Sequence, residues 1–254
     1  MGLFDIFKKT DTAQHADSQK ENLGMQALDQ TQAVAGLLEV PPTQRDEEWL
    51  RTFLLALPQA GFRCGTPQII AGPDGFPYFQ LFVPNPGEEF QCFVIAQMIP
   101  DFLLERGYGI VINPGGEQPD WVLTYGDLLN YHLNGAFFSS ESLFSTNDSA
   151  VQVLAKGDEI MIGQPSEAIL PAQTRKLLRD FFELNGIQDP KVLLMMRKNG
   201  ETVVQDLAFN IVPEGFGSPE HYHNMMQTVT WYLPRHYTLL GLNDDLQDGS
   251  FMPL

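Results

Sequence analysis

The residues that come closest to a chemical site lie in the run Gly215-Phe-Gly-Ser-Pro-Glu-His221-Tyr-His223. Two imidazoles separated by one residue can bind a single divalent metal when they lie on one face of a β-strand. The carboxylate that would complete such a site is missing, because Gln227 stands where it is expected. The sequence therefore names no catalytic residue and no cofactor, and it keeps His221 and His223 as the metal alternative.

The local pattern of this run favours a helix over a strand. Ser218 is a good N-cap, and Pro219 suits the first helical position. On a helix, residues two apart diverge by about 200°, so the two histidines would not share a metal. The apolar positions that follow have helical spacing: Tyr222, Met225, Met226, Val229, Tyr232 and Leu233.

The same helix carries a second kind of candidate site. If its apolar positions face the core, Trp231 points away from the core, beside Asn224 and Gln227. Two interpretations stay open for Trp231. It packs against the N-terminal unit, or it forms the centre of a partner-binding surface with Asn224 and Gln227, since tryptophan is enriched at such centres.

The two cysteines do not form a recognisable site. Cys92 lies in an apolar run, where a buried thiol would be inert, and Cys64 follows Arg63, which could lower its pKa. No histidine is near Cys64 in sequence to act as a base. So few cysteines in a chain without a signal-peptide pattern indicate a reducing cytosol.

The charge of the chain limits its partners. Lys and Arg total 15 against 32 for Asp and Glu, a formal charge of −17 over 254 residues. This balance argues against nucleic acid and would favour a basic protein partner electrostatically, while acidity is also, and more commonly, a means of keeping a protein soluble. No apolar run reaches the roughly 18 residues of a membrane span. Whether the apolar positions among residues 1–9 dock on a surface, and in what oligomeric state the chain exists, the sequence does not say.

Residues 156–242 show the clearest succession of elements, in the order β-α-β-β-α-β. A helix is expected over 171–185, with Pro171 in its first turn and Gly186 as its left-handed cap. Asn199 and Gly200 predict a tight hairpin between two strands. The expected buried stripe of the first helix is Leu177, Leu178, Phe181 and Leu184.

The N-terminal half alternates helices and short strands. Thr43 with Asp46 three residues later predicts the start of a helix that ends before Pro58. Strands are expected over 68–71, 78–83, 90–96, 109–112 and 121–123, and further helices over 99–106 and 127–133.

Two stretches resemble the enhanced serine sensitivity proteins, the SseB family. Residues 155–165 with the following helix and strand 191–196 resemble its C-terminal domain, and residues 107–114 with 121–129 resemble its N-terminal domain. The resemblance implies a cytoplasmic bacterial α+β protein of two small domains, with helices packed on mixed or antiparallel sheets. The expected parts are an N-terminal segment (1–39), an N-terminal domain (40–138), a C-terminal domain (150–243) and an acidic tail (244–254).

The resemblance also implies a non-enzymatic role, and we expect a module that binds or regulates another protein. Two alternatives stay open. One is a cupin-like, metal-dependent enzyme that uses His221 and His223, and the other is an acidic immunity-type inhibitor of a basic toxin.

Overall fold

The computed structural model describes residues 28–85, 87–139, 142–144, 160–199, 202–244 and 249–254. Within them the chain is α+β, as predicted, with two mixed five-stranded sheets and six α-helices packed on them. Backbone contacts divide the chain into unit 1 (Met1–Pro100 and Ile110–Val122) and unit 2 (Asp101–Gly109 and Leu123–Leu254). The domain limits expected from the sequence stay predictions. None of the described helices is long and apolar enough to cross a membrane.

The sheet of unit 1 has the strand order β3-β1-β2-β4-β5. Strands β1 and β2 form an antiparallel hairpin, and Gly75 in its turn has a φ of 83°, which suits glycine. The N-cap of α2 is Asp46, not Thr43, because the Asp46 carboxylate accepts a hydrogen bond of 2.8 Å from the Trp49 N–H. These elements are β1 (Gly61–Ala71), β2 (Pro77–Phe82), β3 (Phe93–Val94), β4 (Gly109–Ile112), β5 (Trp121–Leu123), α2 (Glu47–Ala56) and α3 (Ile95–Met98).

Unit 2 begins with α4 and α5, and from β6 onward it has the predicted order β-α-β-β-α-β, followed by one further short strand. Its sheet runs β10-β7-β8-β9, with β6 also paired to β7, and β9 lies parallel to β8. Of the two residues predicted to form the hairpin turn, Asn199 is the last residue of β7 and pairs with Thr202, and Gly200 lies outside the described residues. The elements are α4 (Leu104–Arg106), α5 (Tyr125–Asn134), β6 (Ile160–Gly163), α6 (Ala172–Leu184), β7 (Lys191–Asn199), β8 (Thr202–Phe209), α7 (Pro219–Val229), β9 (Leu239–Gly241) and β10 (Met252–Pro253).

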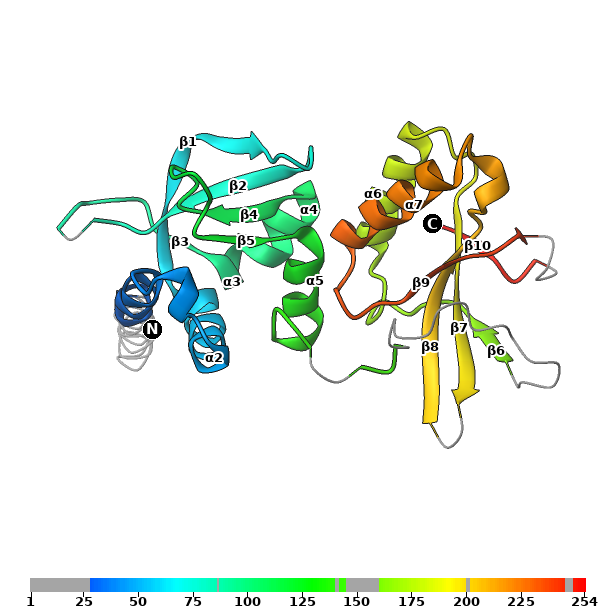
Figure 1. Cartoon of the computed structure of the whole chain (residues 1–254), viewed down its shortest axis with the longest axis horizontal. Helices are drawn as coiled ribbons and strands as arrows, with labels where there is room; N and C mark the ends of the chain where they lie inside the picture. The colour runs from blue at the N-terminus through cyan, green and yellow to red at the C-terminus, as the bar shows by residue number, and fades with distance from the viewer. Residues whose placement is uncertain (1–27, 86, 140–141, 145–159, 200–201, 245–248) are drawn as a thin grey trace, which may run out of the picture. The chain divides into compact units, whose positions relative to one another are not determined.

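Helices α6 and α7 lie on the same face of this sheet (Figure 1) and share one apolar core with it. Along α6, Thr174, Leu178 and Phe182 are fully buried, at the spacing i, i+4, i+8. The predicted stripe was wrong at Leu184, which is 87% exposed, because the buried row turns that residue toward solvent. Pro171 is the N-cap residue of α6 rather than part of its first turn.

Candidate functional site

Helix α7 begins as its sequence predicts. The Ser218 hydroxyl accepts a hydrogen bond of 3.2 Å from the His221 N–H, and Pro219 occupies the first helical position. Met225 and Val229 are buried against the sheet. The helix then tightens into a 3-10 turn at Thr230–Tyr232. One side of α7 is therefore fixed in the core, and the neighbouring side is available for a site.

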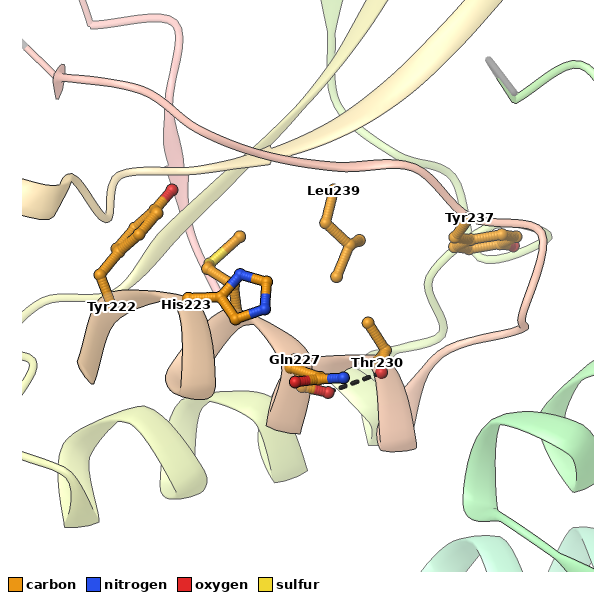
Figure 2. A pocket seen from close by; sticks show the side chains of 7 residues that line it. Tyr222, His223, Gln227, Thr230, Tyr237 and Leu239 are labelled. Carbon is orange, nitrogen blue, oxygen red and sulfur yellow. Dashed lines mark hydrogen bonds between the residues drawn. The ribbon is translucent and has the colours of Figure 1, made fainter. Parts of the chain in front are cut away.

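A cavity of about 300 Å³ lies between α7 and the segment that leads into β9 (Figure 2). Tyr222, Met226 and Thr230 follow one another at intervals of four residues, so they form one row along the helix. The opposite side of the cavity comes from residues on and just before β9. We call this cavity the α7–β9 pocket, and its lining residues are Tyr222, His223, Met226, Gln227, Thr230, Tyr237 and Leu239.

Two polar groups of the lining already have partners in the protein. The Tyr237 hydroxyl donates a hydrogen bond of 2.8 Å to the Ile169 carbonyl, and the Thr230 hydroxyl donates one of 2.6 Å to the Gln227 carbonyl. These bonds fix the two side chains in place. They also leave those hydroxyl protons occupied, so the two residues act mainly as rigid parts of the lining.

Other polar groups of the lining are available to a ligand. Within the described residues, the Gln227 side-chain amide and the His223 ring have no hydrogen-bond partner. Burial, and secondarily the negative charge of Glu214, raise the pKa of Tyr222, which keeps its hydroxyl protonated at neutral pH. None of the seven lining residues is an Asp, Glu, Lys, Arg or Cys, so the pocket suits an uncharged group that can also accept or donate hydrogen bonds.

The structure separates the three residues of the predicted partner-binding surface. Asn224 and Gln227 are exposed, and Gln227 lines the pocket. Trp231 is only 6% exposed. Its ring lies 6.2 Å from that of Tyr125 and 5.1 Å from that of Tyr232. Trp231 therefore packs within unit 2, against Tyr125 and Tyr232, and its indole is not exposed.

The two histidines of the metal alternative also have different surroundings. Both lie on helix α7, as the local sequence pattern predicts, and not on a strand. The His221 ring contacts Phe216, with ring centroids 5.5 Å apart, whereas His223 lines the pocket. Among the described residues, no group of three or more His, Cys, Asp or Glu side chains is placed to hold a metal.

The cysteines differ from their expected environments. Cys92 is exposed and not buried, because β3 begins only at Phe93 and Cys92 lies in the loop before it. Cys64 is half-buried, and burial raises the pKa of its thiol, opposite to the lowering expected from Arg63. A raised thiol pKa disfavours the nucleophilic thiolate at neutral pH.

Sequence reasoning missed Tyr237 and Leu239 as site residues, because they meet α7 only through the fold. The signal that was present is the width of the apolar stripe on α7. Tyr222 and Met226 flank the buried row of Met225 and Val229 and are only partly buried.

No family model, no curated protein and no solved structure matches this chain.

Proposed function

We propose that this chain is a non-enzymatic cytoplasmic protein of the SseB type that binds a partner protein through the α7–β9 pocket. The observation that carries the proposal is the pocket itself. It combines the apolar side chains of Met226 and Leu239 with the polar groups of His223 and Gln227, which have no side-chain hydrogen-bond partner in the described part of the chain. A rigid apolar pocket with a few polar groups is the usual form of an anchoring site for a partner side chain.

The lining supports binding more than catalysis. Of the seven residues, His223 is the one whose side chain is a common general base. A general base is usually oriented by a second acidic or polar group, and the lining provides no carboxylate for that role. Gln227, which the sequence assigned to a partner-binding surface, is part of this pocket.

The acidic inhibitor is a second candidate, favoured by the formal charge of −17. It differs from the first in its salt dependence. An interface led by charge weakens strongly as ionic strength rises, whereas an interface anchored in a neutral pocket changes little.

Affinity capture with matched variants tests the proposal. Met226→Arg places a charged side chain at the pocket, and Leu184→Arg makes the same kind of change on α6, where residue 184 is 87% exposed. We expect the wild type and Leu184→Arg to capture the same partner, identified by mass spectrometry. The amount of this partner captured by Met226→Arg should be lower by about tenfold or more. Equal capture by all three proteins would overturn the proposal.

Circular dichroism and thermal unfolding verify that each variant is folded. Gln227→Arg provides a second pocket variant at an exposed position, where a long side chain is tolerated without disturbing the core. It should reduce capture in the same direction as Met226→Arg.

A further inference from the structure

Strand β9 forms an edge of its sheet. In the part of the chain that the structure describes, β9 pairs with β8 alone. The Thr238 carbonyl accepts a hydrogen bond from the Leu207 N–H, and the Leu242 N–H donates one to the Phe209 carbonyl, both 2.9 Å long. Since alternate residues of a strand direct their backbone groups to opposite edges, Leu239 and Gly241 direct theirs away from β8.

The outer edge of β9 borders the pocket at Leu239. The Leu239 side chain is part of the pocket lining, while its backbone N–H and C=O point to the outer edge, where no strand pairs within the described ranges. The other end of the strand is closely covered. A Cβ added at Gly241 would lie 2.1 Å from the Ile211 carbonyl oxygen and 2.2 Å from the Tyr222 hydroxyl. A chain laid along β9 would therefore have its side chain at the pocket, between β9 and α7 (Figure 2).

The charges around the pocket differ from those of its lining. The lining carries no formal charge with His223 neutral, but exposed Glu214 and Glu220 lie at the end of α7 that carries Tyr222. Glu214 is close enough to Tyr222 to act on its hydroxyl. A cationic side chain would complement this end, in keeping with the formal charge of −17.

We infer that the α7–β9 pocket receives an extended peptide segment of the partner protein, which adds as a strand to the outer edge of β9. The segment inserts one large apolar side chain against Met226 and Leu239 and directs a Lys or Arg toward Glu214. The inference rests on the proposed function and specifies the partner's form and chemistry. Strand addition supplies affinity through backbone hydrogen bonds, and the pocket supplies specificity.

The size of the pocket agrees with such an occupant. Its volume of about 300 Å³ is at the small end of the range for small-molecule sites, roughly 300–1,000 Å³. It suits one large side chain better than a cofactor. The row of Tyr222, Met226 and Thr230 lines the cavity opposite Tyr237 and Leu239, so it can contact successive residues of the added strand that point toward α7.

The test uses short linear peptides selected by phage display against the full chain. The best peptide is synthesised, its Kd is measured by isothermal titration calorimetry, and each backbone amide is then N-methylated in turn. A strand paired on one edge loses affinity, by about tenfold, only at alternate amides. Met226→Arg should abolish binding of the peptide and Leu184→Arg should not.

Charge is tested on the same peptide. Glu214→Gln should raise Kd about two- to fivefold, since exposed ion pairs are weak, and salt should reduce the difference. Glu183→Gln, an exposed position on α6, is the matched control.

Two results would overturn strand addition. The first is a peptide whose binding is abolished by Met226→Arg but whose affinity does not fall at alternate amides in the N-methyl scan. The second is that every selected peptide still binds the Met226→Arg protein. Neither result alters partner capture by the whole chain, so the proposed function would be judged separately. Unchanged partner capture by Met226→Arg would overturn both.

Discussion

Helices α6 and α7 cover the same face of one sheet, but they meet it differently. On α6, Thr174, Leu178 and Phe182 are fully buried. On α7, Met225 and Val229 are also buried, yet the adjoining row borders the α7–β9 pocket. Helix α6 therefore fills the space between itself and the sheet, whereas α7 leaves part of that space open.

This difference separates stability from recognition. A filled contact contributes to folding through apolar burial and leaves nothing for a ligand. A residue beside an open pocket buries less surface, so it contributes less to folding and remains available to a partner. Substitutions on α6 should therefore lower stability, and substitutions beside the pocket should lower binding.

The largest effect is expected on the filled side, for Phe182→Ala. The Phe182 ring is fully buried and lies 5.4 Å from that of Phe209. Its removal leaves a cavity, and we expect the free energy of unfolding to fall by about 3–5 kcal/mol, measured by urea denaturation. Leu184→Ala, on the exposed side of α6, should change it by less than about 0.5 kcal/mol. A loss below about 1 kcal/mol for Phe182→Ala would contradict the filled contact.

The next largest effect is expected for Asp127→Asn, which should affect both the stability of the fold and the binding of the partner. The buried Asp127 carboxylate accepts hydrogen bonds of 2.7 and 2.8 Å from Arg235, two residues before Tyr237 of the pocket. We expect a loss of about 2–3 kcal/mol in the free energy of unfolding, below the usual range for a fully buried pair because Arg235 is 59% exposed.

Loss of the Arg235 contact should also weaken partner capture, since the segment that carries Tyr237 would be less firmly held. Lys191→Gln, which removes an ion pair whose Asp244 carboxylate is 35% exposed rather than buried, serves as the control and should leave capture unchanged. A stable Asp127→Asn protein with full capture would show that the pair does not hold the pocket.

Raising the pH to 12 should lower the free energy of unfolding by about 2 kcal/mol through the buried Tyr125, since one unit of pKa shift is worth roughly 1.4 kcal/mol. Burial raises the pKa of Tyr125, whose hydroxyl lies 3.0 Å from that of Thr174 on α6, from 10.0 to about 12. Because the folded state holds the proton more tightly, this contribution is complete below pH 10 and is lost as the pH rises through about 12. Tyr125→Phe should reduce that fall in stability more than Tyr222→Phe, measured by urea denaturation between pH 9 and 12. If the free energy of unfolding falls equally steeply with pH in the Tyr125→Phe and Tyr222→Phe proteins, the larger contribution of Tyr125 is contradicted.

The sequence predicted the elements of unit 2 well because each has its own local signal. Ser218 and Pro219 mark the start of α7, and the left-handed Gly186 follows the end of α6, where it was expected. Errors arose where two positions have similar local chemistry. Thr43 and Asp46 are both good N-caps, and only the hydrogen bond to Trp49 distinguishes them.

The site was harder to predict than the fold. Gln227 was named from helical geometry and does line the pocket. Trp231 was assigned to the same exposed side because a continuous helix was extended through it, whereas the chain tightens into a 3-10 turn there. Leu239 carries no signal of its own, since its role depends on the approach of α7 to β9.

Apart from the control variants, Met226→Ala should have the smallest effect on stability, and it distinguishes the roles of the two helices most clearly. Met226 is only partly buried and borders open space, so its truncation enlarges an existing pocket and should cost no more than about 1 kcal/mol in the free energy of unfolding. Partner capture should nevertheless fall severalfold, because the lost methylene and thioether groups would contact the inserted side chain. Leu178→Ala, at a buried position of α6, should show the reverse, with a loss of about 2–5 kcal/mol and unchanged capture by the folded protein. If both variants lose stability and capture in the same proportion, reduced capture follows from unfolding, and the two helices do not divide these roles.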